Sequence, residues 1–211
     1  MIFESFLNNI DLFKSAELGG LESQFRLAPK MRLQYNAEKI AASNPKKAAV
    51  LALFYPNEQN ETCFLLTQRA SYNGTHSAQI SFPGGKIEAS DENLQATAIR
   101  ETFEEVGVTA NQIEIIREIT DVYIPPSNFL ATPFLAFSKT KPIITINHEV
   151  DHTFDVKLSD LFDDNNITSI NITTSYAKNI DVPCFKLNNY IVWGATAMML
   201  NEIKELLKIV S

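Results

Sequence analysis

The sequence of 211 residues contains two cysteines, Cys63 and Cys184, and they form no Cys-x-x-Cys pair. Zinc sites and disulfide scaffolds need paired or clustered cysteines, so the sequence predicts neither. Long apolar runs are also scarce. The longest comprises the eight residues 48–55, whereas about 20 are needed to cross a bilayer. The first residues carry an acid, Glu4, and no basic segment, which is not typical of a secretory signal. We therefore expect a cytoplasmic protein without a membrane partner.

Basic residues are fewer than acidic residues, with 18 lysines and arginines and 25 aspartates and glutamates, so the net charge is −7. A general nucleic-acid-binding protein needs a basic face that neutralises phosphates, so this balance disfavours such a function. A small phosphate-bearing substrate stays open, because a bound metal ion can supply positive charge locally. The 45% of hydrophobic residues can form a buried core, which excludes a disordered or fibrous protein.

Hydrophobic spacing predicts how the first quarter of the chain is organised. Apolar residues recur at helical spacing over residues 3–13, and this pattern stops at Gly19-Gly20. Residues 28–45 are mostly polar and predict a connection. We expect residues 1–45 to form a helical arm that packs on a main domain of residues 46–211. The apolar spacing of the first helix would also suit a homodimer.

Within the main domain, apolar runs separated by turn residues predict strands, and amphipathic spacing predicts helices. Residues 81–85 should interrupt regular structure, because they contain Pro83 and two glycines. Strands flanked by helices predict an α/β fold, specifically an α/β/α sandwich on a mixed β-sheet. The expected strands are residues 47–55, 62–69, 113–123, 129–137, 184–187 and 190–193. The expected helices are residues 92–106, 159–162 and 199–210.

The most informative segment is the predicted helix of residues 92–106. At about 100° per residue, Glu101, Glu104 and Glu105 share one helix face. An acidic face is most often solvated surface. Three carboxylates on one face also suit Mg²⁺ or Mn²⁺, which prefer oxygen ligands. Residue types alone leave both interpretations open. The opposite, core-facing side is expected to comprise Ala98, Ile99, Thr102, Phe103 and Val106.

The spacing of these residues resembles the signature of the Nudix hydrolase family. The second half of that signature, Arg-Glu-apolar-x-Glu-Glu-x-Gly-apolar, corresponds to residues 100–108, with Thr102 in an apolar slot. Glu92 precedes Arg100 with seven residues between them, as the family requires. Six residues rather than five separate Gly85 from Glu92, which indicates one additional residue in the loop.

The flanking segments resemble the coenzyme A pyrophosphatase branch of this family. Residues 65–69 have the sequence Leu-Leu-Thr-Gln-Arg and lead to Phe-Pro-Gly-Gly at residues 82–85. Asp91 stands where this branch carries an aspartate. Gly74 and Ala78 depart from the branch, which usually has arginine and glycine there. The missing arginine removes a potential bidentate contact with phosphate.

The resemblance implies metal-dependent hydrolysis of a diphosphate linkage. The cofactor would be Mg²⁺ or Mn²⁺, and the implied metal ligands are Glu101, Glu104 and Glu105. The implied catalytic residues are Glu104 or Glu149 as general base and Arg100, which would orient the glutamates. The implied substrate-binding residues are Arg69, Lys86, Gly84 and Gly85.

Coenzyme A is the expected small-molecule substrate, split into 3′,5′-ADP and 4′-phosphopantetheine. One alternative keeps the chemistry and takes ADP-ribose, NADH or a nucleoside triphosphate. Another is a Nudix domain retained as a non-catalytic, ligand-binding regulator. The complete set of signature acids favours an enzyme. Some residues also have structural interpretations, with Arg69 and Lys86 as solvated charges, Glu149 as a surface acid and Trp193 as core packing.

Overall fold

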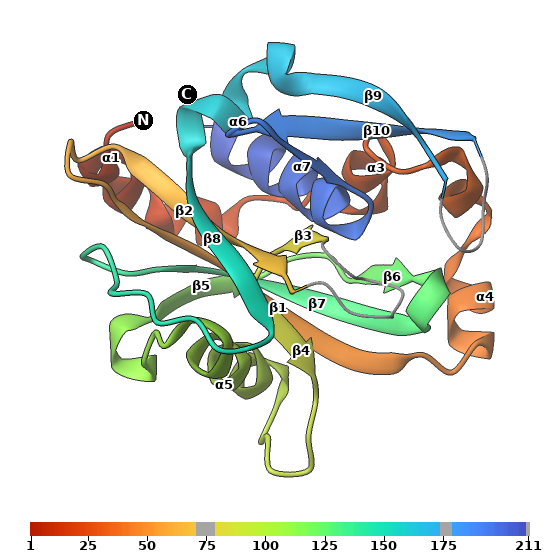
Figure 1. Cartoon of the computed structure of the whole chain (residues 1–211), viewed down its shortest axis with the longest axis horizontal. Coiled ribbons are helices and arrows are strands. Elements are labelled where there is room, and N and C mark those ends of the chain that lie inside the picture. Colours follow the sequence, from red (N-terminus) through yellow and green to blue (C-terminus); the bar gives the residue numbers. More distant parts are fainter. Residues whose placement is uncertain (71–78, 174–178, 210–211) are drawn as a thin grey trace.

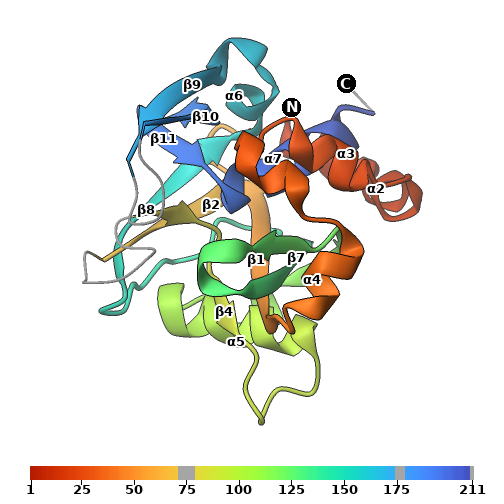
Figure 2. The same cartoon turned by 90° about the vertical axis from the view of Figure 1, so that its right-hand side faces the viewer.

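A mixed β-sheet lies between helices on both of its faces in the computed structural model, which describes residues 1–70, 79–173 and 179–209 (Figure 1). Helix α5 (Leu94–Val106) covers one face, and α7 (Ala195–Lys208) lies on the other together with the N-terminal helices (Figure 2). The predicted α/β sandwich is confirmed. None of the helices within the described ranges is long and apolar enough to span a membrane.

The main sheet is mixed because one of its strand pairs is parallel. The strands of this sheet are β1 (Lys46–Pro56), β2 (Thr62–Arg69), β3 (Ile80–Ser81), β4 (Gly84–Lys86), β5 (Glu114–Glu118), β6 (Val122–Ile124), β7 (Phe129–Phe137) and β8 (Val150–Lys157). They lie in the order β3-β2-β1-β7-β5, while β4, β6 and β8 pair with β1, β7 and β2. β1 runs parallel to β7, from Lys46 beside Phe129 to Phe54 beside Phe137. The other pairs are antiparallel.

Strand β1 separates two hydrophobic cores. Leu51 and Leu53 point into the core beneath α5, whereas Ala52 and Phe54 point into the core shared with α7 and the N-terminal helices. Successive side chains of a strand point to opposite faces, so a strand buried on both faces needs apolar residues at every position. This explains why residues 48–55 form a continuous apolar run.

Helix α5 has residues suited to both of its ends. The Asn93 side chain accepts a hydrogen bond from the backbone N–H of Ala96 at 2.9 Å, and Gly107 ends the helix with φ of 75°. The prediction that Phe103 faces the core is wrong, because this residue is 53% exposed. The buried side instead includes Glu105, because the helix is rotated so that this acid points inward.

The N-terminal arm is more broken than expected. Its helices are α1 (Phe3–Asn8), α2 (Ile10–Ser15), α3 (Gly20–Phe25), η1 (Lys30–Gln34) and α4 (Ala37–Ala42). Gly19-Gly20 therefore begins a helix rather than ending the first one, and residues 28–45 contain two helical turns where a polar connection was expected. Phe6 is fully buried and stacks on Phe54 of β1 with ring centroids 5.3 Å apart. The arm thus shares the core of the main domain.

A second, antiparallel sheet of order β11-β10-β9 leads into α7. Its strands are β9 (Ile167–Ile172), β10 (Ile180–Leu187) and β11 (Tyr190–Trp193). The strands expected at residues 184–187 and 190–193 pair as an antiparallel hairpin, and its turn residues Asn188 and Asn189 have φ of 49° and 66°. The expected interruption holds at Phe82 and Pro83, although Ser81 ends β3 and the two glycines belong to β4. The single strand expected at residues 113–123 is divided into β5 and β6, and β8 and β9 were not expected. The remaining helical turns are η2 (Ala110–Gln112), η3 (Pro125–Ser127), α6 (Leu158–Phe162) and η4 (Asp164–Asn166).

Candidate active site

The glycine pair of β4 places the backbone directly under the acidic helix. A Cβ atom on Gly84, whose φ is 153°, would lie 2.3 Å from the carbonyl oxygen of Ala49 in β1. A Cβ atom on Gly85 would lie 2.4 Å from the carboxylate of Glu101. Only glycine allows such close approach, so β4 can pair with β1 while its backbone contacts α5.

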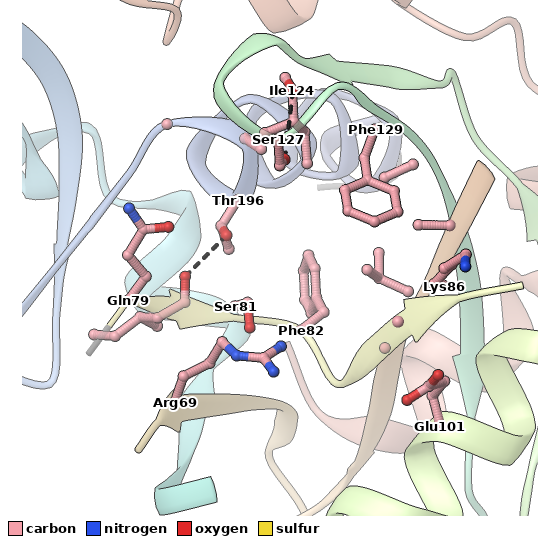
Figure 3. A pocket seen from close by; sticks show the side chains of 18 of the residues that line it. Arg69, Gln79, Ser81, Phe82, Lys86, Glu101, Ile124, Ser127, Phe129 and Thr196 are labelled. Carbon is pink, nitrogen blue, oxygen red and sulfur yellow. Dashed lines mark hydrogen bonds between the residues drawn. The ribbon is translucent and has the colours of Figure 1, made fainter. Parts of the chain in front are cut away.

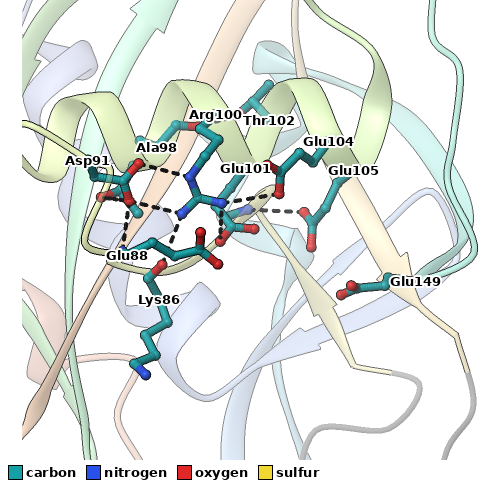
Figure 4. Close-up of polar contacts among 12 residues, drawn as sticks. Lys86, Glu88, Asp91, Ala98, Arg100, Glu101, Thr102, Glu104, Glu105 and Glu149 are labelled. Carbon is teal, nitrogen blue, oxygen red and sulfur yellow. Dashed lines mark hydrogen bonds and ion pairs between the residues drawn. The ribbon is translucent and has the colours of Figure 1, made fainter.

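Arg100 binds the acids of the site together, as Figure 4 shows. Its Nη1 donates to Glu101 at 3.0 Å and to Glu104 at 3.1 Å. Its Nη2 donates to the carbonyl oxygen of Lys86 at 3.1 Å, which ties α5 to β4. Arg100 itself does not line the cavity into which these glutamates face. This arrangement agrees with a residue that orients the glutamates.

Asp91 holds Arg100 in this position. The Arg100 Nε and Nη2 atoms donate to the two carboxylate oxygens of Asp91 at 2.8 and 2.9 Å, a bidentate pair. Thr97 and the backbone N–H of Glu88 also donate to this carboxylate, each at 2.9 Å. Glu92, which the signature comparison singled out, is exposed. Five residues separate Gly85 from Asp91, so the acid at the family spacing from the glycine is Asp91.

Replacing Asp91 by asparagine is expected to lower the free energy of unfolding at pH 7 by about 1.5–3 kcal/mol, the range for hydrogen bonds to charged groups. The bonds from Arg100 hold the pKa of Asp91 well below its ordinary value. A lowered folded-state pKa stabilises the protein above the unfolded value of about 3.9 and loses that effect as the pH falls. Urea unfolding between pH 7 and pH 3 should therefore show the two proteins converging in acid.

Glu92→Gln is the matched control for this measurement, because it removes the adjacent negative charge from an exposed side chain. Its unfolding free energy should stay within about 0.5 kcal/mol of wild type at every pH. Equal losses in the two variants would mean that Asp91 stabilises the fold no more than its neighbour does.

Glu105 is buried and Glu101 is half-buried. Burial raises the pKa of Glu105 to about 7, although its Oε2 accepts the backbone N–H of Gly84 at 3.0 Å and Arg69 lies nearby. Burial also raises the pKa of Glu101, against the opposing effect of Arg100. The charged form of a desolvated carboxylate is stabilised strongly by a neighbouring cation.

Arg69 lies between helix α5 and Glu149. Its Nη1 is 3.7 Å from Glu105 Oε1, and its Nη2 is 3.2 Å from Glu149 Oε2. The backbone fixes this neighbourhood too, because the N–H of Ala70 donates to the carbonyl oxygen of Glu149 at 2.8 Å. The structure therefore brings Glu149 from beyond the signature to the acidic helix.

The side chains present have the chemistry of a Mg²⁺ or Mn²⁺ site. Glu101, Glu104 and Glu105 offer only carboxylate oxygens, the donors that hard cations prefer. Because Gly85 has no side chain, the space next to the Glu101 carboxylate is left open for a cation to approach. Within the described residues, no three acidic, histidine or cysteine side chains already converge as a metal cage. The glutamates are held by Arg100, Arg69 and the Gly84 N–H instead.

A cavity of about 460 Å³ joins these acids to an apolar region. Figure 3 shows Phe82 between the side with Arg69 and Glu101 and the side with Ile124 and Phe129. The predicted site residues that line this cavity are Arg69, Gly84, Gly85, Lys86, Glu101, Glu104, Glu105 and Glu149.

Sequence reasoning missed part of the cavity wall. Trp193 was expected to pack in the core, but it is half-buried and lines the cavity beside the start of α7. Arg32 lines it from the N-terminal arm, a segment to which no functional residue was assigned. Trp193 belongs to residues 191–197, a segment that resembles the coenzyme A branch, whereas no motif marks Arg32. Both residues reach the cavity only through the fold. Gly74, His76 and Ala78 of the flanking motif lie outside the described residues.

Comparison with known proteins agrees with this geometry. The NUDIX domain model matches residues 45–168, more than half of the chain. The chain belongs to the Nudix family. The Nudix hydrolase NudL of Yersinia pestis is 26% identical over 166 residues, which cover 78% of this chain and 81% of that protein. The predicted Nudix pyrophosphohydrolase is thereby confirmed, and enzymes of this family generally need divalent metal ions such as Mg²⁺ or Mn²⁺.

Solved structures show the same Nudix fold. The Nudix hydrolase RenU of M. smegmatis has a TM-score of 0.56 and 18% identity, with 79% of this chain and 88% of that chain covered. A MutT/nudix family protein of Enterococcus faecalis has a TM-score of 0.50 and 14% identity, with coverage of 92% and 76%. At these identities the similarity concerns the fold alone.

Proposed function

We propose that this Nudix hydrolase cleaves the diphosphate of coenzyme A, or of a coenzyme A derivative, into 3′,5′-ADP and 4′-phosphopantetheine. The observation that carries the proposal is that Glu101, Glu104 and Glu105 meet Arg69 and then an apolar region within one continuous cavity. A substrate that extends on both sides of a diphosphate needs charged and apolar walls together. The segments of residues 65–69 and 82–85 support the same substrate through their resemblance to the coenzyme A branch.

The chain's own residues would bind and orient the diphosphate. Arg69 and Lys86 line the cavity and can contact phosphate oxygens, and a guanidinium does so in a bidentate manner. Arg100 keeps Glu101 and Glu104 together on one side of the cavity. Mg²⁺ or Mn²⁺ held by Glu101, Glu104 and Glu105 would neutralise phosphate oxygens and lower the pKa of an attacking water.

A carboxylate must accept the proton of that water. Glu104 and Glu149 are the candidates, since both line the cavity and both keep about half of their side-chain surface exposed, at 51% and 49%. Glu101 and Glu105 are more buried, which suits groups that hold a cation. Comparing the pH dependence of kcat for Glu104→Gln and Glu149→Gln would identify the general base.

Mass spectrometry of the products tests the proposed substrate. Coenzyme A, ADP-ribose, NADH and dGTP are offered separately to the purified protein with Mn²⁺ or Mg²⁺. We expect 3′,5′-ADP and 4′-phosphopantetheine from coenzyme A. We also expect product formation to stop when EDTA removes the metal and to resume when excess metal is added. Glu104→Gln serves as the reference with strongly reduced but measurable turnover.

Each other outcome would contradict a defined part of the proposal. Cleavage of another compound in preference to coenzyme A would keep the Nudix chemistry and replace the substrate. Binding of a compound without turnover of any would favour the ligand-binding regulator instead. Full turnover by Glu104→Gln would mean that the reaction does not use the acidic helix in the proposed way.

A further inference from the structure

The end of the cavity away from the acidic helix is built largely by segments outside the matched family domain. This region, here named the distal chamber, comprises Arg32, Ile124, Phe129, Trp193 and Thr196. Residues 45–168 contain the shared domain, whereas Arg32 comes from the N-terminal arm and Trp193 and Thr196 from the last strand and helix. Walls outside the shared domain can change which substrate fits without changing the chemistry that the domain supplies.

Arg32 is held in the wall of the distal chamber by neighbours from two elements. Its Nη1 donates to the carbonyl oxygen of Tyr123 at 3.0 Å and contacts the sulfur of Met198 at 3.4 Å. The first contact places it beside Ile124, and the second places it against α7. A guanidinium keeps its full charge whichever of its donors are in use. Arg32 therefore adds a fixed positive charge to a chamber whose other named walls are uncharged.

Aromatic side chains accompany this charge. Phe129 and Trp193 both line the distal chamber and are partly buried. A second cation strengthens the local positive potential, because Lys46 Nζ lies 5.9 Å from the centroid of the Phe129 ring. Aromatic walls favour a flat ring, and guanidinium and ammonium groups favour phosphate. A neutral chain of amides could contact the aromatic side chains but would not interact favourably with the positive charges.

We propose that the distal chamber binds the nucleoside half of the substrate and that Arg32 recognises a phosphomonoester on its ribose. This inference rests on the proposed function and deepens it, because coenzyme A carries such a phosphate at the 3′ position. Under this proposal, the arm is a specificity element for the active site. Arg32 contacts the substrate far from the bond that is cleaved, so its loss affects KM and kcat/KM more than kcat.

Steady-state kinetics with coenzyme A and 3′-dephospho-coenzyme A test this role. We expect wild type to prefer coenzyme A in kcat/KM by about 10- to 100-fold, as for one charge-assisted contact. Arg32→Gln should reduce that preference to within about threefold by lowering kcat/KM for coenzyme A alone, and Arg32→Lys should keep part of it. Arg26→Gln is the matched control, since Arg26 also belongs to the arm but pairs with Glu205 on the surface.

Calorimetric binding of 3′,5′-ADP and 5′-AMP separates this inference from the proposed reaction. If wild type cleaves neither coenzyme A compound, the proposed function fails. The inference still stands if 3′,5′-ADP binds more tightly than 5′-AMP and Arg32→Gln removes the difference. Equal binding of the two nucleotides by wild type would overturn it. Equal losses for both coenzyme A compounds in Arg32→Gln would also overturn it, because they would indicate that Arg32 only holds Tyr123 and Met198 in place.

Discussion

Replacing Glu105 by glutamine is expected to lower kcat by about 100- to 1,000-fold, the usual cost of removing one group that stabilises transition-state charge. The side chain is 6% exposed and lies beside Arg69 and Gly84. A buried carboxylate in this position would supply negative charge for a bound cation. Glutamine has the same shape and still accepts the Gly84 N–H, but it carries no charge.

The stability of this variant should not fall. Burial opposes the charged form of Glu105, so a neutral side chain of equal size costs less to bury. We therefore expect the thermal midpoint of metal-free Glu105→Gln to equal or exceed that of wild type. Activity and stability would change in opposite directions, which separates a functional role from general damage to the fold.

Steady-state kinetics with saturating Mn²⁺, thermal unfolding and Mn²⁺ titration measure these effects together. Glu92→Gln is the control, because Glu92 is exposed and does not line the cavity. Its kcat should stay within about twofold of wild type, as for a surface substitution. A kcat for Glu105→Gln within threefold of wild type, or unchanged Mn²⁺ affinity, would remove Glu105 from the metal site.

The strands and the helix at the centre of the fold were predictable because their hydrophobic patterns and their terminating residues indicate the same bounds. β2 and β7 occur at the predicted residues, and α5 ends at the predicted Gly107. In each case the hydrophobic pattern and the terminating residue agree. The arm was less predictable, because Asn9 interrupts an otherwise continuous helical pattern. Its side chain donates to the carbonyl oxygen of Ser5 at 2.8 Å and so competes with the helix for that acceptor.

The site residues that lie together on one helix could be predicted from the sequence. The site residues that come from distant segments could not, because only the folded chain brings them together. The acids of α5 share a helix face, which spacing alone can indicate. Asp91 was not assigned its role, because a loop conformation decides which of two adjacent acids meets Arg100. Arg32 and Trp193 are 161 positions apart in the numbering, and only packing of the arm against α7 brings both to one cavity. Spacing carries no information about such long-range contacts.

Glu202→Ala is expected to produce the largest loss of stability, about 3–5 kcal/mol, because it would leave several buried donors without a partner. Glu202 lies on α7 and has no exposed surface. Its carboxylate accepts the backbone N–H of Gly20 at 2.9 Å, Gln24 Nε2 at 2.8 Å and Thr120 Oγ1 at 2.6 Å. These donors come from α3 and from the segment between β5 and β6. Glu202 therefore fastens the arm to the main domain.

Glu205→Ala is the matched control for this variant. Glu205 lies one turn further along α7 and pairs with exposed Arg26 of the arm at 3.0 Å, so its loss should cost less than about 1 kcal/mol. Urea unfolding measures both variants, and hydrogen exchange should show faster exchange over residues 20–35 in Glu202→Ala alone. Similar small losses in the two variants would contradict the assigned role of Glu202. A large loss with unchanged exchange in residues 20–35 would mean that Glu202 stabilises the main domain and not the attachment of the arm.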